Sequence, residues 1–254
     1  MVWPGALSME LTCYHALHNR FLVAPFGTCP DGDRIGQLCR RHRADGMLCG
    51  LARPGEEIFL RIWNADGSEA EMSGNGVRIF ARALLDAKIW DRRGGTIVTA
   101  GAVVGCEFTE RGEVVAEMAP AELEESALTV TTEFGPAVGH GASLGNPHFI
   151  IPVRAMPRDW RRRAATIAVH PKFPNRTNVH FLRVLDPRHI AIRIYERGAG
   201  ETASCGSGAA TCATLAHRHL GCASQLQVHM AGGILSVTLA ENWIRILGPV
   251  VRIF

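Results

Sequence analysis

The chain has 254 residues, of which 47% are hydrophobic and 20% are charged, and its formal net charge is +3. This length allows one large domain or two domains of about 120 residues each. The composition excludes a disordered or fibrous chain, and the small net charge argues against a protein built to bind nucleic acid.

Eight cysteines are spread along the chain without a C-x-x-C pair or a zinc-like grouping with histidines. We therefore expect free thiols, no metal site and a reducing, cytoplasmic location. The start lacks a signal-peptide pattern and no apolar run reaches about 18 residues, so no membrane segment is expected. The three arginines at 161–163 are interpreted as solvated surface.

In chain order, residues 1–8 are interpreted as an upstream extension, because a more regular, strand-like stretch begins at Met9. Helical periodicity is strong at 77–89 and 209–219 and weaker at 31–43 and 157–169. Short apolar or alternating runs predict strands at 57–63, 95–99, 102–108, 113–118, 148–153, 179–184, 190–195, 226–229, 234–239 and 243–247.

The order of strands, a glycine-rich corner, a buried helix and more strands occurs twice. This weak duplication predicts an α+β protein with two halves, each a mostly antiparallel sheet wrapped on one central helix. We expect the halves at 1–117 and 118–244, with a crossing within 119–139 and a final strand near 245–254 that returns to the first half.

The two glycine corners have the same layout. Cys205 precedes Gly-Ser-Gly, and Ser73 precedes Gly-Asn-Gly, each just before a helix-forming stretch. Each side chain is thus expected at a helix N-terminus, where unpaired N–H groups can hold an anion. Two matched corners are stronger evidence than one G-x-G, and they indicate a site built from two facing halves.

Cys205 could be a small buried hydrophobe, as most free cysteines are. Its context favours chemistry, because Gly206 and Gly208 let a ligand approach the backbone and the helix dipole is expected to lower the thiol pKa. The corner lacks the Lys-Ser/Thr ending of a phosphate-binding loop, and Glu196 and Arg197 end the run that leads into it.

Three asparagines and a histidine lie near expected strand ends. Taken singly, Asn64, Asn146 and Asn178 are typical of turn caps, and His148 is typical of a satisfied core histidine. Taken together, they could supply amide groups around a polar ligand, with His148 setting the ionisation of a nearby thiol.

These motifs resemble the diaminopimelate epimerase family of cofactor-independent amino acid epimerases and racemases. The resemblance covers nearly the whole chain and is carried by His15, Asn19, Phe21, residues 64–82, residues 145–148, Asn178 and residues 195–209. It implies two α+β halves facing each other, an amino acid substrate between the two helix N-termini, no cofactor, and a homodimer.

The resemblance also implies roles for single residues. Cys205 would be one of two acid/base groups on opposite faces of the substrate's α-carbon, and Ser73 stands in the place of the other, normally a cysteine. His148 and Glu196 would tune the reacting groups. Backbone N–H groups of the helix ends would hold the α-carboxylate, at Gly74, Asn75, Gly206 and Ser207. The pocket would be lined by Asn19, Asn64, Asn146, Asn178, Glu196 and Arg197.

Three departures from the family pattern bear on substrate and mechanism. Arg20 replaces an acid near the pocket entrance, and Cys49 stands where an ungapped comparison places a substrate-binding glutamine. Both favour a substrate other than diaminopimelate, such as histidine or another amino acid of specialised metabolism. Ser73 affects mechanism, because an alkoxide is far harder to form than a thiolate.

The sequence is therefore compatible with three functions. The leading one is an amino acid epimerase or racemase with Cys205 as the strong acid/base group and Ser73 as a weaker partner. The second is a lyase or dehydratase that uses Cys205 on one face only. The third is a form disabled by a Cys-to-Ser substitution, which binds substrate without turning it over.

Overall fold

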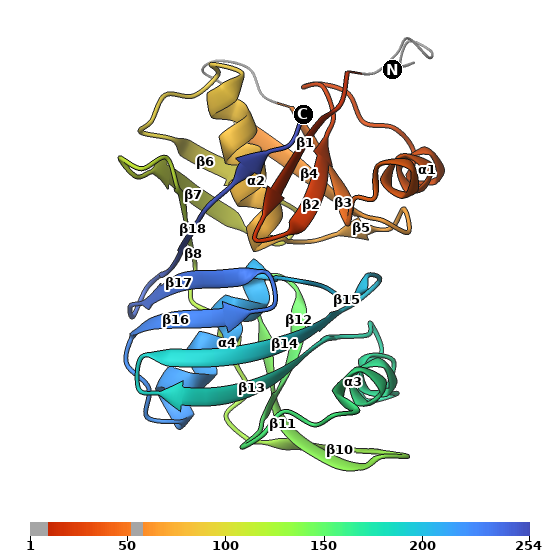
Figure 1. The fold of residues 1–254 in the computed structure, drawn as a ribbon, viewed down its shortest axis with the longest axis vertical. Helices are drawn as coiled ribbons and strands as arrows, with labels where there is room; N and C mark the ends of the chain where they lie inside the picture. Colours follow the sequence, from red (N-terminus) through yellow and green to blue (C-terminus); the bar gives the residue numbers. More distant parts are fainter. Residues whose placement is uncertain (1–9, 52–57) are drawn as a thin grey trace.

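A computed structural model describes residues 10–51 and 58–254. The predicted extension at 1–8 and the first residue of the predicted strand at 57–63 lie outside these residues. Figure 1 shows two halves stacked along the long axis, with α2 inside the upper half and α4 inside the lower one.

The N-terminal half contains two helices and the first eight strands. Its elements are β1 (Thr12–Ala16), β2 (Asn19–Val23), α1 (Gly32–His42), β3 (Gly46–Leu51), β4 (Ile58–Asn64), β5 (Glu69–Ala70), α2 (Gly74–Asp86), β6 (Gly95–Val98), β7 (Val103–Phe108) and β8 (Val114–Met118).

The C-terminal half contains the other two helices. Its elements are β9 (Glu122–Leu123), β10 (Leu128–Thr132), β11 (Gly135–Ser143), β12 (Pro147–Pro152), α3 (Trp160–Ala168), β13 (Asn178–Asp186), β14 (His189–Glu196), β15 (Gly200–Glu201), α4 (Gly206–His219), β16 (Gln225–Met230), β17 (Gly233–Leu239) and β18 (Ile244–Gly248). The last strand is β19 (Val251–Arg252).

The two halves share one topology. In the first, α1 connects the parallel pair β2–β3 and α2 connects the parallel pair β4–β6. In the second, α3 connects the parallel pair β12–β13 and α4 connects the parallel pair β14–β16. The other ladders are antiparallel, and β5 and β15 occupy equivalent places beside β4 and β14. The predicted α+β fold of two pseudo-symmetric halves is confirmed.

The halves are joined through the sheet. Strand β8 pairs with β18 in antiparallel register, and β19 pairs with β1, so that Tyr14 lies opposite Arg252. The chain passes from β8 into β9 at the start of the expected crossing segment, whose remainder holds β10 and the beginning of β11. The boundaries 1–117 and 118–244 are kept as a proposal.

The central helices are buried because of their composition. In α4 the residues from Gly206 to Ala216 are all buried, and small side chains let the sheet close tightly around them. The hydroxyl groups of Thr211 and Thr214 donate to carbonyl groups one turn earlier, so they add no unpaired polar atom to the core.

The basic cluster on α3 is used within the chain. Arg161 pairs with Glu201, and Arg163 pairs with Asp159 at 2.9 Å, while Arg162 lies over the ring of Phe134. Across residues 10–51 and 58–254, no helix is long and apolar enough to cross a membrane, and no three His, Cys, Asp or Glu side chains gather as metal ligands would.

Candidate active site

Ser73 and Cys205 occupy the same position on equivalent helices. Ser73 caps α2 with φ −149° and ψ 112°, and Cys205 caps α4 with φ −142° and ψ 116°. The Ser73 Oγ accepts the N–H of Gly76 at 3.0 Å, and the Cys205 Sγ accepts the N–H of Gly208 at 3.4 Å. The extended backbone at each cap places these side chains at a helix N-terminus, as the sequence predicted.

The two helix ends meet through glycines. A Cβ atom on Gly206 would lie 2.9 Å from the Cα of Gly74, and one on Gly74 would lie 3.0 Å from the Cα of Gly206. Only residues without a side chain allow this approach. The caps bond the third N–H of each helix, which leaves the first two N–H groups of each without an intrahelical partner. These groups are concentrated where the positive ends of both helix dipoles converge.

Asn75 connects the two halves with its side chain. Its Nδ2 donates to Asn19 Oδ1 at 3.1 Å and to Ser204 Oγ at 2.9 Å, and its Oδ1 accepts from Arg78 at 2.7 Å. Arg78 is fully buried, and burial lowers its pKa to about 10. The amide of Asn75 is thus occupied by protein groups, so only its backbone N–H is available to a ligand.

Cys205 is held as a neutral thiol. It is 4% exposed, and burial raises its pKa well above the ordinary value; the nearby Glu196 carboxylate raises it further. Hydrogen bonds from Ser207 and Gly208 lower that pKa but are outweighed. The helix end acts on the pKa of Cys205 in the predicted direction through the Gly208 N–H, but loss of hydration and the Glu196 charge raise that pKa by more.

Glu196 stands beside Cys205 at the end of β14. Burial raises the pKa of the Glu196 carboxyl, and the Thr202 hydroxyl donates to Glu196 Oε1 at 2.5 Å. A carboxylate of raised pKa close to a buried thiol is suited to exchange a proton with it.

His148 bonds to neither Ser73 nor Cys205 through its ring nitrogens. Its Nε2 lies 2.8 Å from Asn146 Oδ1 and its Nδ1 lies 2.8 Å from His180 Nε2. Burial lowers the pKa of His148 well below its ordinary value and that of His180 to about 3, so both rings are neutral near pH 7. The link from His148 to Cys205 runs through Asn146 and Ser207, with 3.5 Å from Asn146 Nδ2 to Ser207 Oγ and 3.5 Å from Ser207 Oγ to Cys205 Sγ.

We predict that the free energy of unfolding falls as the pH drops below 6.5. His180 has an ordinary pKa of 6.5 and a folded pKa of about 3, so between these values the unfolded chain binds a proton that the folded protein excludes. The contribution of neutral His180 is complete above pH 6.5 and is lost toward pH 3. Urea titrations should show a loss of about 1.4 kcal/mol per pH unit from this group. The loss should be smaller in His180→Met, and equal slopes would contradict the prediction.

A small cavity of about 40 Å³ lies between the halves and collects most of the predicted pocket residues. The predicted residues that line it are Asn19, Asn64, Ser73, Asn146, Asn178, Glu196 and Arg197. The lining includes neither Cys205 nor the first two residues of each central helix, which are Gly74, Asn75, Gly206 and Ser207. This volume is of the order of a few water molecules.

The asparagines are both turn groups and pocket groups. Asn178 donates to Pro147 O at 2.8 Å and accepts the N–H of Arg197 at 2.9 Å. Asn64 donates to Ser68 Oγ at 3.0 Å. These bonds fix the amide planes at the cavity wall. The asparagines therefore both stabilise the local backbone and line the cavity.

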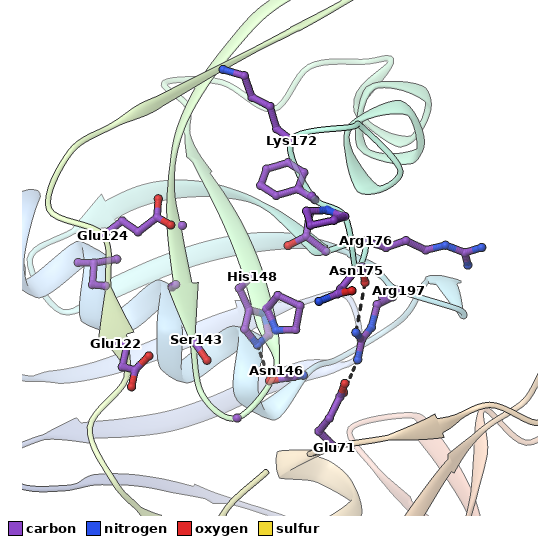
Figure 2. A pocket seen from close by; sticks show the side chains of 18 residues that line it. Glu71, Glu122, Glu124, Ser143, Asn146, His148, Lys172, Asn175, Arg176 and Arg197 are labelled. Carbon is purple, nitrogen blue, oxygen red and sulfur yellow. Dashed lines mark hydrogen bonds and ion pairs between the residues drawn. The ribbon is translucent and has the colours of Figure 1, made fainter. Parts of the chain in front are cut away.

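A groove of about 510 Å³ opens beside the cavity and shares Asn146 and Arg197 with it. Figure 2 shows Glu71 extending across to Arg197, whose guanidinium also donates to Asn175 O. Because Glu71 precedes the Ser73 corner and Arg197 follows β14, this ion pair joins the two halves at the boundary between groove and cavity.

Arg20 and Cys49 do not line the cavity. Side chains alternate along a strand, so Asn19 and Phe21 line the cavity while Arg20 points to the other face and donates to His42 O. Cys49 packs with Ile35 and Leu38 of α1 in a separate apolar cluster. Neither side chain reaches this cavity, because β2 and β3 turn both of them toward α1. Their effect on substrate recognition stays a prediction.

The comparisons with known proteins agree with this geometry. The sequence model described as diaminopimelate epimerase matches residues 14–124 and 141–252. The chain belongs to the diaminopimelate epimerase family. It is 36% identical to diaminopimelate epimerase of Azotobacter vinelandii strain DJ, with 97% of each chain covered. It is 35% identical to diaminopimelate epimerase 2 of Nostoc sp. strain PCC 7120, with 92% of this chain and 90% of the relative covered.

Solved structures share the fold at low identity. A probable proline racemase from Agrobacterium radiobacter K84 matches with a TM-score of 0.72 at 17% identity, over 96% of this chain and 91% of that one. A hydroxyproline epimerase from Agrobacterium vitis matches with a TM-score of 0.70 at 19% identity, over 96% and 90%. At such identities the likeness concerns the fold of the diaminopimelate epimerase family.

Several site residues of this family member escaped the sequence analysis. Asp45 lines the cavity and accepts from Asn19 at 2.9 Å, and Ser204 bonds to Asn75 across the halves. His180 bonds to His148, and Glu71 pairs with Arg197. Ser204 and Glu71 each lie within two positions of a predicted corner, which is a signal that could have found them. Asp45 and His180 carry no such signal.

Proposed function

We propose that this protein is a cofactor-independent amino acid epimerase that inverts the α-carbon of diaminopimelate. The observation that carries the proposal is the pair of matching helix N-termini, with Ser73 and Cys205 as caps and Gly74 against Gly206. Relatives named diaminopimelate epimerase, at 35–37% identity, support this substrate. The two residues that favoured a different amino acid, Arg20 and Cys49, lie on the far face of the sheet from the cavity.

The helix ends would hold the reacting carboxylate. An amino acid α-proton is very weakly acidic, and without an electron sink the developing carbanion needs electrostatic stabilisation. The free N–H groups of Gly74, Asn75, Gly206 and Ser207 are donors that supply it, and closure of the halves removes competing water. The Asn64, Asn178 and Arg197 side chains are polar groups available for the far end of the substrate.

Cys205 and Glu196 would handle the proton on one face of the α-carbon. With Glu196 ionised and close by, the thiol can pass its proton to the carboxylate and act as a thiolate base, or it can donate the proton to the carbanion. When the thiolate takes the α-proton, the Ser73 hydroxyl supplies a proton to the opposite face. The centre is thereby inverted, and the proton count balances when Glu196 releases its proton to solvent and Ser73 takes one from solvent.

Ser73 makes the two faces of the α-carbon unequal. A serine hydroxyl that donates its proton to the carbanion becomes an alkoxide, and abstraction on that face needs the alkoxide as its base. Proton transfer at the Ser73 face is therefore the slower chemical step in both directions. The equilibrium between the epimers is unaffected, because it depends on the substrates alone.

The same serine favours a second candidate, a form that binds substrate without turning it over. It also suits a one-base lyase, because such an enzyme needs no acid on the second face. The three functions differ in product: the epimer, the unchanged amino acid, or a keto acid with ammonia.

We predict that Ser73→Cys raises kcat by about 10²-fold or more, since a thiol can act as the missing base and such groups contribute about 10² to 10⁴. The backbone at Ser73 already matches that at Cys205, so the thiol needs no rearrangement. The assay measures epimerisation of diaminopimelate and of a panel of basic amino acids. Ser126→Cys, on the exposed segment between β9 and β10, is the control and should leave kcat unchanged. A Ser73→Cys protein with no gain on any substrate would count against the epimerase and against a disabled epimerase alike.

We further propose a cytoplasmic location and a homodimer. The cytoplasm is supported by the eight cysteines, all of which are free thiols in the structure. The dimer rests on the family resemblance, and sedimentation equilibrium of the purified chain tests it.

A further inference from the structure

His180 is a fully buried side chain that the proposed chemistry does not use. It lies on β13, with its ring directly beneath the first turn of α4: a Cβ atom on Gly208 would come within 2.4 Å of His180 Cε1. Its Nε2 bonds to His148 Nδ1 at 2.8 Å, and its Nδ1 has no hydrogen-bond partner among the described residues. The hydrogen-bonded series His180–His148–Asn146 therefore begins at a ring nitrogen that has no partner among the described residues.

The unpaired His180 Nδ1 determines which atom donates and which accepts in each of the following hydrogen bonds. If His180 carried its proton on Nδ1, a buried N–H would be left unpaired, which is rarer and costlier than an unpaired lone pair. His180 therefore carries its proton on Nε2 and donates to His148 Nδ1. His148 must then carry its own proton on Nε2, and it donates to Asn146 Oδ1 at 2.8 Å.

The direction continues through Asn146 to the cavity. Because Oδ1 accepts from His148, the amide group of Asn146 presents its NH₂ on the other side, where it lies 3.5 Å from Ser207 Oγ and borders the cavity. Ser207 Oγ accepts from Asn146 and is free to donate to Cys205 Sγ, 3.5 Å away. A chain with the opposite direction would present an amide oxygen to the cavity instead.

We propose that His180 is a positioning residue that locks Asn146 with its NH₂ toward the substrate. This inference rests on the proposed function and deepens it. With Arg197 on the same wall, the locked amide adds a hydrogen-bond donor for the carboxylate at the far end of the proposed substrate.

The test compares His180→Met with His180→Gln. Both variants remove the ring, but the Gln amide can still donate to His148 Nδ1 and the Met side chain cannot. We expect His180→Met to raise KM for diaminopimelate about tenfold or more with kcat changed less than about threefold, and to weaken the preference for diaminopimelate over lysine, which lacks the second carboxylate. His180→Gln should restore most of the KM and of the preference.

Nitrogen NMR of the histidine rings gives a readout that needs no turnover. We expect His148 to be protonated on Nε2 in the wild-type protein and in His180→Gln, and to be a mixture of tautomers in His180→Met. A wild-type His148 protonated on Nδ1, or equal KM values for the two variants, would overturn the inference. If the protein proves to have no epimerase activity, the ring tautomers still decide the direction of the chain, so the two failures can be told apart.

Discussion

Cys205→Ala should lower kcat/KM by about 10³-fold or more, the largest loss expected from a single change outside the helix contact. Cys205 caps α4 beside Glu196, and of the two cap side chains it is the more acidic group and the one with a carboxylate nearby to take its proton. Without it, neither epimer can exchange a proton on that face, and Ser73 cannot take over because it belongs to the opposite face. The measurement is the initial rate in both directions with the folded variant.

Cys212→Ala is the matched control for the Cys205 prediction. Cys212 is fully buried in the same helix and its thiol also has a raised pKa, but its position is two turns from the helix end. We expect its kcat/KM to stay within about threefold of wild type, because only packing is changed. If Cys205→Ala kept more than a tenth of the activity, the thiol would not be the acid/base group.

Gly206→Ala should abolish most of the activity by steric means. The new Cβ would lie 2.9 Å from backbone atoms of Gly74 and 3.0 Å from the Asn75 nitrogen, and backbone cannot move aside as a side-chain tip can. The two helix ends would be forced apart, with a stability cost of about 1 to 3 kcal/mol. Because a displacement of about 1 Å at a reacting centre can cost about 10²-fold, kcat/KM should fall by at least that factor.

Gly36→Ala is the control for the Gly206 prediction. Gly36 is also a buried helical glycine, but a Cβ there would make ordinary contacts of 3.5 Å and more. We expect unchanged activity and a melting temperature at or above that of wild type, since alanine favours a helix over glycine. By the pseudo-symmetry, Gly74→Ala should behave as Gly206→Ala does. Full activity in either variant would mean that the helix contact is not part of the working site.

The sequence was sufficient for the elements with strong periodicity. All four helices and the ten expected strands are present, because their apolar spacing matches the face they bury. The shorter or glycine-rich strands were mostly missed: β3 carries two glycines and β11 three, and β5, β9 and β15 have two residues each. The five-residue strands β2 and β10 were missed as well. Such strands form because a neighbouring strand offers a ladder, which is tertiary information.

The site residues also fall into those that the sequence could predict and those that it could not. The corners at Ser73 and Cys205 were identifiable because their chemistry lies in consecutive residues. Asp45 and His180 reach the site only through the register of β3 and β13 beside their parallel partners. That Arg20 and Cys49 lie away from the cavity could not be predicted, because linear alignment does not tell which face of a strand a side chain occupies.

The pKa of Cys205 shows a further limit. A helix N-terminus can be inferred from glycines and a cap, and its effect on a thiol has a known sign. The opposing effect of burial depends on how tightly the halves close, and here burial and Glu196 together outweigh the helix. The thiol is therefore protonated at rest, and in the proposed mechanism the thiolate forms by transfer of its proton to Glu196.

Solvent isotope incorporation tests the central claim most directly. The protein is incubated with one stereoisomer of diaminopimelate in deuterium oxide, and the recovered amino acid is analysed for deuterium at Cα and for configuration. Two groups on opposite faces predict that the inverted product carries deuterium at Cα from its first appearance. Deuterium at Cα with retained configuration, or release of a keto acid and ammonia, would contradict the two-faced site at Ser73 and Cys205.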